Sequence, residues 1–236
     1  MSESTTRYAL YFSPPQDNPW WPLLSHWLGY DAATGQEAQQ LCAPPLDRAE
    51  FREITEHARH YGAHATLKAP FRLMPNCTER DLVQAVDKFA SEQSAFPMPT
   101  LQLAHLSNFI ALIPSRDDAR INRIADDCTT RFDRFRAPLS DAEMARRLRD
   151  PLDALSLRLL ASWGYPHVLE RYQFHISLTG SLNGYPQKTA KDVLQAAREV
   201  FEPVTGVPLH FDAICVFRQR CSNERFALIH RAGLSS

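Results

Sequence analysis

The stretches HATLKAP at residues 64–70 and HISLTGS at residues 175–181 share the pattern His-x-[Thr/Ser]-Leu inside a short apolar run. Side chains alternate between the two faces of a β-strand, so the histidine and the hydroxyl residue of each stretch would face the same way. The leucine would face the other way and anchor the strand in a core. The repeat therefore predicts two matching strands, each presenting an imidazole and a hydroxyl to a surface or cleft.

The sequence that follows each motif also repeats. Apolar side chains at helical spacing predict an amphipathic helix over residues 78–93 and another over 187–201. Paired apolar runs around a polar turn then predict a hairpin over 101–114 and another over 208–230. The order strand, helix, hairpin thus occurs twice. Three further elements are expected upstream, a strand over 7–12 and helices over 17–29 and 46–62.

This duplication predicts an α+β fold with two similar lobes, whose antiparallel sheets face a central cleft. We expect a single bilobal domain over residues 1–236, with lobe one at about 1–135 and lobe two at about 171–236. The connector at about 136–170 is helical and more charged, with a break near Pro151. It is either a lid or a structural spacer, and the sequence leaves both open.

Composition narrows the class of protein. The chain of 236 residues is 44% hydrophobic and 22% charged, which is typical of a globular protein with a real core. Its net charge of −1 gives no basic field that would capture DNA or RNA, so local groups must hold any anion. Scattered cysteines, a polar start and the lack of a long apolar run favour a cytoplasmic protein without a membrane partner. No metal or other cofactor is expected.

Two imidazoles and two hydroxyls around one pocket suit phosphodiester cleavage without a metal. Of His64 and His175, one would take a proton from the attacking oxygen and the other would give a proton to the leaving oxygen. The hydroxyls of Thr66 and Ser177 would donate hydrogen bonds to the non-bridging phosphate oxygens. Which histidine is the base stays open.

These paired motifs resemble those of the 2H phosphoesterase superfamily, whose LigT-like members include the bacterial RNA 2′,5′-ligase/cyclic phosphodiesterases. That resemblance implies a bilobal fold, a cleft between the lobes and no metal. Four phrases further resemble a branch associated with phosphonate metabolism, the DUF1045-like proteins. The branch implies a small cyclic phosphodiester as substrate, such as 5-phosphoribosyl 1,2-cyclic phosphate. The phrases are RYALYFSPP at 7–15, HWLGYDAATG at 26–35, HATLKAPFRL at 64–73 and WGYPHVLERYQFHISLTG at 163–180.

Four further residues are candidates for binding substrate. Lys68 continues the face of the first motif and could contact a second phosphate, and Thr179 continues the face of the second motif. Tyr11 is the tyrosine of the first strand that we expect to point into the cleft. Arg218, at the end of a predicted strand, could bind an anionic group of the substrate.

Two other functions remain as alternatives. An RNA-end enzyme that opens 2′,3′-cyclic phosphates or makes 2′,5′ linkages would need a basic cleft with stacking aromatic side chains. A non-catalytic module would bind a nucleotide or another phosphate ester without turnover. The expected partner is a small phosphorylated sugar or nucleotide, with RNA as the other choice.

Overall fold

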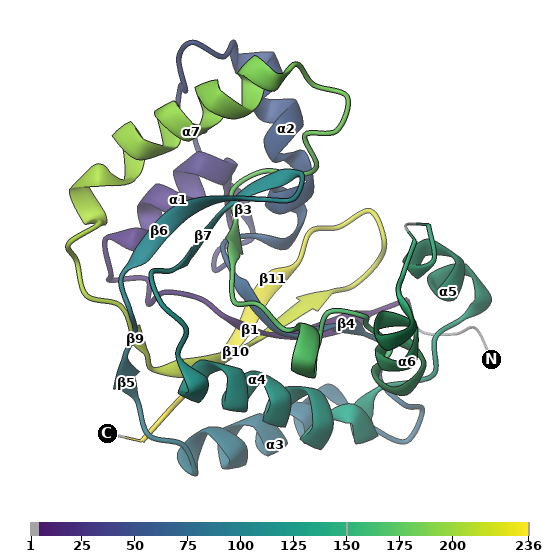
Figure 1. Ribbon diagram of the computed structural model, residues 1–236. Coiled ribbons are helices and arrows are strands. Elements are labelled where there is room, and N and C mark those ends of the chain that lie inside the picture. The colour runs from purple at the N-terminus through teal and green to yellow at the C-terminus, as the bar shows by residue number, and fades with distance from the viewer. Residues whose placement is uncertain (1–4, 150, 236) are drawn as a thin grey trace.

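The computed structural model describes residues 5–149 and 151–235 as an α+β fold built on one antiparallel sheet, which confirms the predicted fold class (Figure 1). Its strands are β1 (Arg7–Phe12), β4 (Ala65–Phe71), β6 (Leu101–Leu106), β7 (Phe109–Pro114), β8 (Ile176–Ser177), β10 (Ala213–Gln219) and β11 (Ala227–Gly233). Their order across the sheet is β11-β10-β1-β4-β8-β7-β6, and all neighbours run antiparallel.

The sheet differs from the two separate sheets expected from the sequence. The two motif strands, β4 and β8, pair directly, with Ala65 opposite Ile176. The hairpin β6–β7, from the first half of the sequence, borders β8, whereas the hairpin β10–β11, from the second half, borders β1. The β4 side of the β4–β8 pair therefore combines strands from both halves, β1 with β10 and β11, whereas the β8 side holds only the hairpin from the first half. Side-chain alternation shows which face of a strand is buried but not which edge finds a partner, so the sequence did not reveal this arrangement.

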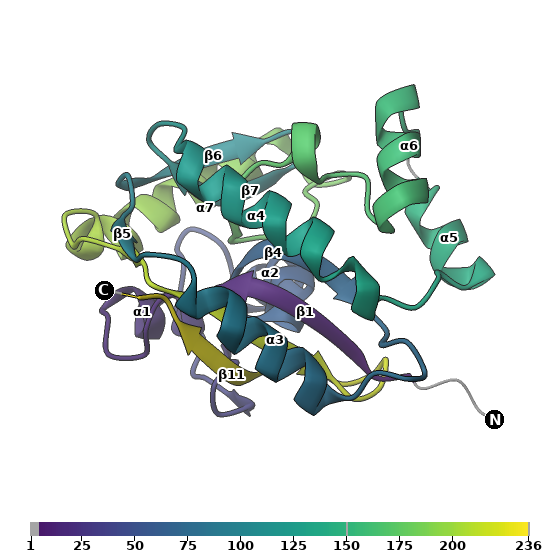
Figure 2. The same ribbon diagram turned by 90° about the horizontal axis from the view of Figure 1, so that it is seen from below.

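Helices cover the sheet. Helix α3 packs on β10 and β11, α4 packs on β4, and α7 packs on β6 and β7. Figures 1 and 2 both show α5 and α6 beside the end of the sheet where β1 begins. The helices are α1 (Trp20–Leu28), α2 (Arg48–Tyr61), α3 (Glu79–Ser91), α4 (Ala119–Arg131), α5 (Asp141–Arg147), α6 (Ala154–Trp163) and α7 (Gln187–Phe201).

Local signals in the sequence set the helix ends. Asp47 caps α2 by accepting a hydrogen bond from the Glu50 amide, and Thr78 forms a capping box with Asp81 at the start of α3. Gly29 ends α1 with a φ of 73°, a left-handed conformation that glycine adopts without a steric penalty. These ends agree with the helices expected from the sequence.

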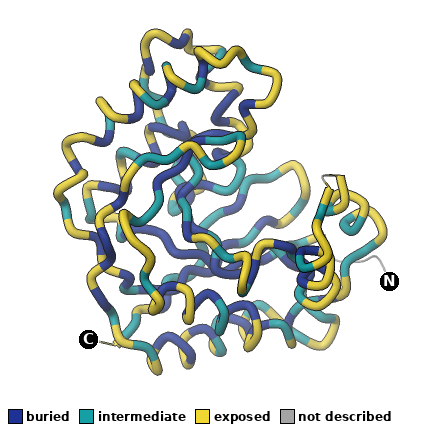
Figure 3. Tube along the Cα trace, viewed as in Figure 1, coloured by how far each residue is buried: buried dark blue, intermediate teal, exposed yellow. Residues whose placement is uncertain are grey.

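Short elements complete the fold, and burial concentrates on the central strands and the inner faces of the helices (Figure 3). By contrast, α5 has no buried residue. The short strand pairs are β2 (Tyr30–Asp31) with β3 (Gln36–Glu37) and β5 (Phe96–Pro97) with β9 (His210–Phe211). The 3₁₀ turns are η1 (Asp133–Phe135), η2 (Leu169–Arg171) and η3 (Glu202–Val204).

In the part of the chain that the structure describes, no helix has the length and apolar character that a membrane span requires. The five cysteines are all free thiols. The cytoplasmic location stays a prediction.

Candidate functional site

The pairing of β4 with β8 brings the two motifs together. Continuing the antiparallel register from Ala65 and Ile176 places His64 beside Ser177 and Thr66 beside His175. Residues directly opposite in such a pair have Cβ atoms about 4.5–5.5 Å apart, and diagonal neighbours lie within about 7–8 Å. The side chains of both motifs line one cavity of about 310 Å³. The structure thus brings together the four residues that the sequence selected first.

The two histidines have matching hydrogen bonds. The Nδ1 atom of His64 lies 2.9 Å from the Gly62 carbonyl oxygen, and the Nδ1 atom of His175 lies 2.8 Å from the Gln173 carbonyl oxygen. A carbonyl only accepts hydrogen bonds, so we assign the proton of each neutral ring to Nδ1. Nε2 then carries the lone pair. The Thr66 hydroxyl lies 3.3 Å from Nε2 of His64 and can donate to it.

Burial keeps both imidazoles neutral in the free protein. The pKa of His64 is lowered to about 4, mainly by burial, with the hydrogen bond to Gly62 opposing the change and the neighbouring His175 adding to it. Burial also lowers the pKa of His175, against the opposing hydrogen bond to Gln173. Both rings remain half-buried rather than sealed, and both line the cavity. An anion that enters will therefore meet two rings ready to take up a proton.

The Tyr11 ring packs against the imidazole of His64. It stacks on the imidazole with centroids 3.8 Å apart and planes 27° apart, and it also packs against the Phe217 ring, with centroids 5.0 Å apart. Only 1% of Tyr11 is exposed, and burial raises the pKa of its phenol well above the usual value. Tyr11 does line the cavity, as expected, and its main contact is this stacking platform.

Lys68 does not reach the cavity, contrary to the prediction. Its ammonium donates to the Thr129 carbonyl at 2.9 Å and pairs with Asp133 at 3.2 Å, and only 3% of the residue is exposed. The physical reason is a register shift in β4: Thr66 pairs with Tyr11 but Lys68 pairs with Leu10, so Lys68 turns to the opposite face, where α4 packs on the strand. This helix covers the strand at Lys68 and supplies partners that satisfy the buried charge.

Thr179 and Arg218 also lie outside this cavity. The Thr179 hydroxyl accepts a hydrogen bond from the Ile110 amide and donates one to the Gly180 carbonyl. Backbone groups near the end of β8 therefore use both hydrogen-bonding roles of this hydroxyl. Thr179 borders a second, neighbouring cavity instead. Arg218 forms an ion pair with Glu79 of α3 at 2.9 Å. Backbone or helix partners therefore hold both groups away from the first cavity, and their contacts with substrate stay predictions.

Several cavity residues were not selected from the sequence. Arg7 lies on β1 on the same face as Tyr11, four residues away, which is a signal that alternation could have provided. Arg146 and Arg147 enter from α5, and Tyr165 from the segment after α6. The sequence of the connector is charged, but nothing in it indicates that the connector borders the site.

A second cavity of about 580 Å³ continues from the first. The two share Thr66, His175 and Ser177 of the motifs together with His57 and Tyr165, so these three motif residues lie between the cavities. The Phe109 ring lies 5.4 Å from the His175 ring on this side. The site therefore has space on both sides of the motif residues.

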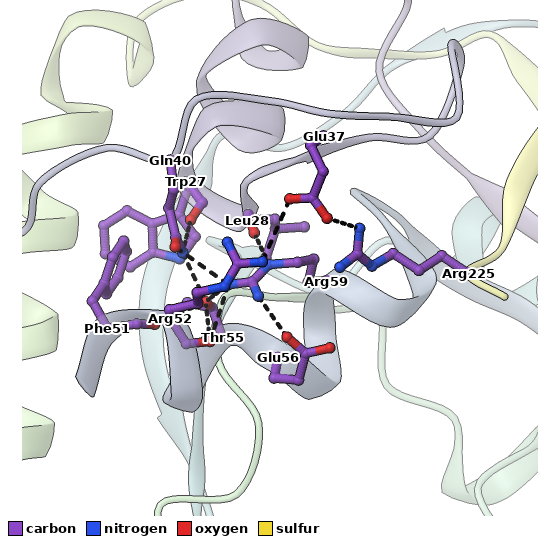
Figure 4. Close-up of polar contacts among 10 residues, drawn as sticks. All are labelled: Trp27, Leu28, Glu37, Gln40, Phe51, Arg52, Thr55, Glu56, Arg59 and Arg225. Carbon is purple, nitrogen blue, oxygen red and sulfur yellow. Dashed lines mark hydrogen bonds and ion pairs between the residues drawn. The ribbon is translucent and has the colours of Figure 1, made fainter. Parts of the chain in front are cut away.

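A buried arginine anchors α2, the helix that leads into the first motif (Figure 4). Arg59 has no exposed surface and donates to the Leu28 and Arg52 carbonyls, the Thr55 hydroxyl and the Glu56 carboxylate. These bonds tie α2 to the end of α1. Because α2 ends just before Gly62, they also fix the carbonyl that orients His64.

The backbone conformation of Gly62 allows its carbonyl to reach the His64 ring. The φ of Gly62 is +77°, and a Cβ at this position would lie 2.6 Å from the Ala32 Cβ. Any other residue would be strained in its backbone and would collide with the neighbouring loop. The turn that aims the Gly62 carbonyl at His64 therefore requires glycine.

No group of three or more histidine, cysteine, aspartate or glutamate side chains within residues 5–149 and 151–235 has the geometry to hold a metal ion.

Comparison with known proteins identifies the family. Residues 66–227 match a family described as "Protein of unknown function (DUF1045)". The chain belongs to the DUF1045 family. This confirms the branch that the sequence phrases resembled, and the matched segment includes Thr66, His175 and Ser177.

Two curated relatives carry a functional name. The chain is 40% identical over 219 residues to "Ribose 1,5-bisphosphate phosphokinase PhnN" of Janthinobacterium sp. (strain Marseille), covering 92% of this chain and 48% of the relative. It is 31% identical over 205 residues to the protein of the same name in Laribacter hongkongensis (strain HLHK9), covering 86% and 47%. The chain thus spans about half the length of these relatives.

These names contradict the predicted reaction. A phosphokinase transfers a phosphoryl group, whereas the sequence-based prediction was a 2H-type cyclic phosphodiesterase, a hydrolase, with an RNA-end enzyme or a non-catalytic nucleotide-binding module as alternatives. The prediction of a hydrolase is therefore wrong. The motifs place imidazoles and hydroxyls around a phosphate, but that arrangement does not select one phosphate reaction over another.

Proposed function

We propose that this chain binds a phosphorylated ribose in the cavity lined by His64 and His175, as part of an enzyme of the phosphokinase type for which its relatives are named. The observation that carries the proposal is the convergence of the four motif side chains on one face of neighbouring strands. The relatives' name specifies a ribose bisphosphate, which is a ligand of the size and charge that such a cavity suits.

One phosphate fits over the face of the paired motif strands, between the side chains of the two histidines. The diagonal spacing of about 7–8 Å between the histidine positions leaves room for a single phosphate group. In this arrangement the Thr66 and Ser177 hydroxyls donate to phosphate oxygens, as in other sites that hold developing negative charge. His64 and His175 exchange protons with phosphate oxygens through Nε2, which their carbonyl-bonded Nδ1 atoms leave free. These are the catalytic and phosphate-binding roles that we assign.

The proposal assigns the ribose phosphate to this chain and not the nucleotide. The 236 residues contain no G-x-x-x-x-G-K-[ST] sequence, which is the loop that cradles nucleotide phosphates in P-loop kinases. Binding of the sugar phosphate can thus be measured on this chain by itself. The resemblance to the phosphonate-metabolism branch supports the same substrate class.

Calorimetric titration with ribose 5-phosphate tests the proposal. We expect binding by the unmodified chain and an affinity lower by about tenfold or more in His64→Gln and His175→Gln, because glutamine cannot take up the proton that makes each imidazole a charged donor to the phosphate. His105→Gln is the matched control, since His105 is exposed on β6 and does not line the cavity. An absence of binding, or equal binding by all variants, would contradict the proposal.

We further propose that the two motif regions are an internal duplication that forms two lobes of one domain, related to the 2H phosphoesterase fold. Both motifs are followed by a helix, a short strand and a hairpin, and the two short strands, β5 and β9, pair with each other. Both histidines immediately precede their strands and bond to the carbonyl two residues before them. An experimental structure in which the two regions superpose with the histidines in register would support this relationship, and dissimilar paths would refute it.

A further inference from the structure

The cavity extends well beyond the two histidines. It follows β4, with His64 at one end and Pro70 at the other, and the Cα atoms of these residues are about 20 Å apart along an extended strand. A single phosphate occupies only the end at His64. The rest of the cavity is lined by other residues, to which the proposed function gives no role.

Arginines line the far part of this cavity. Arg7 comes from β1, and its Cα lies about 13 Å along the strand from that of Tyr11, the platform of His64. Arg146 and Arg147 come from α5, which Figures 1 and 2 place beside the start of β1. Three positive charges therefore line this cavity in a chain whose net charge is −1.

Two of these guanidinium groups are held by aromatic rings. Arg147 lies 4.6 Å over the Tyr165 ring, and Arg7 lies 5.3 Å over the Phe226 ring. Arg7 also donates through Nε to the Gln219 side chain at 2.7 Å. The aromatic contacts use only the flat face of each guanidinium group, and the bond to Gln219 uses only the Nε–H of Arg7. They orient the guanidinium and leave further N–H donors for an anion.

Positive charge exceeds negative charge in the lining of this cavity, although Glu143 interacts electrostatically with Arg7. Among the residues that the structure describes, Glu143 is the one acidic side chain that lines the cavity. Its carboxylate is already engaged, because it pairs with Arg72 at 3.1 Å and accepts from the Ser140 amide at 2.8 Å. Within residues 5–149 and 151–235, no ion pair joins a carboxylate to Arg7, Arg146 or Arg147.

We infer that Arg7, Arg146 and Arg147 form a second phosphate subsite, so that the cavity recognises a sugar with two separate phosphates. One phosphate sits between the histidines and the other sits among the arginines, with the sugar between them along β4. Guanidinium groups suit this task because their N–H donors match phosphate oxygens in pairs. The inference rests on the proposed function for the first phosphate, and it gives the connector a role in substrate selection.

The connector also explains how these charges stay in place. Helix α5 buries no residue of its own, so packing alone does not hold it. Its Ser140–Glu143 capping box and the Arg72–Glu143 ion pair, with side chains 14% and 16% exposed, fix it to the end of β4. Arg146 is exposed and Arg147 is half-buried, and neither takes part in these fixing contacts, so a loss of both charges should leave the fold intact.

Calorimetry with two ligands separates the subsites. We expect the unmodified chain to bind ribose 1,5-bisphosphate more tightly than ribose 5-phosphate. The double variant Arg146→Gln/Arg147→Gln should lose about tenfold or more in affinity for the bisphosphate, because charge-assisted contacts to the second phosphate are gone. Its affinity for ribose 5-phosphate should fall much less, and an unchanged midpoint of urea denaturation shows that the variant is folded.

The control is a second double variant, Arg149→Gln/Arg158→Gln. It removes the same charge from the same connector, but neither residue lines the cavity. It should keep the full preference for the bisphosphate. An equal loss in both double variants, or a preserved preference in Arg146→Gln/Arg147→Gln, would overturn the second subsite alone. If the unmodified chain binds neither compound, the proposed function fails and the subsite fails with it.

Discussion

At the scale of single residues, the proposal depends on the state of His64. Burial lowers its pKa to about 4, so the free protein presents a neutral ring at neutral pH. A phosphate anion beside the ring favours the charged form and raises the pKa. Binding should therefore take up protons, and affinity for ribose 5-phosphate should rise as the pH falls from 8 towards 6, within the limits set by the second ionisation of phosphate at about pH 6.

Proton NMR titration of the histidine rings tests this expectation. The resonance that disappears in His64→Gln should titrate well below the usual 6.5 in the free protein and at a higher pH in the complex. If that resonance titrates identically with and without saturating ribose 5-phosphate, His64 does not contact the phosphate.

Tyr11 should act through its ring and not through its hydroxyl. Tyr11→Phe keeps the stacking surface under His64 and should bind ribose 5-phosphate within about twofold of the unmodified chain, while Tyr11→Ala leaves a cavity. Large-to-small changes of buried aromatic residues cost about 3–5 kcal/mol of stability. Urea denaturation and calorimetry on both variants give the two measurements. A large loss of affinity in Tyr11→Phe would show that the phenol itself contacts the ligand.

At the scale of elements, the sequence predicted helices and strands well because their signals are local. Capping residues such as Asp47 and Thr78, and the glycine that ends α1, act within one turn. The two-residue strand β8 would have been missed without its match to β4, since its own alternation is too short to detect. The partners of Lys68 and Arg218 were not predictable, because they come from α4, η1 and α3, which approach only in three dimensions.

Arg59 gives a prediction at this scale. Arg59→Met should destabilise the protein by about 3–5 kcal/mol, because removing one partner of a buried charged network leaves the others unsatisfied. Arg52→Met is the matched control, since the Arg52 side chain is 52% exposed, and its stability should change by less than about 0.5 kcal/mol. Urea denaturation measures both. Equal stabilities would contradict the anchoring role of Arg59 in α2.

At the scale of the whole molecule, the sequence predicted the fold class and the four motif residues that line the cavity. It did not predict the single sheet, because strand order depends on which edges meet. It missed the cationic end of the site, because α5 lies far in sequence from both motifs. Its predicted reaction was wrong, since paired imidazoles serve several kinds of phosphate chemistry.

Whole-molecule stability should also depend on the two histidines. Their pKa values are lowered on folding, so below the usual 6.5 the unfolded chain binds protons that the folded chain does not. Stability should therefore decline as the pH falls from about 6.5 to about 4. The double variant His64→Gln/His175→Gln should show a shallower decline in urea denaturation across this window. Parallel curves would mean that neither histidine is held neutral by the fold.

The most direct test of the central claim is a crystal structure of the chain with ribose 1,5-bisphosphate. We predict one phosphate within hydrogen-bond distance of Nε2 of both His64 and His175, with the Thr66 and Ser177 hydroxyls on its oxygens. A bisphosphate bound elsewhere, or bound in this cavity without contact to either imidazole, would contradict the account.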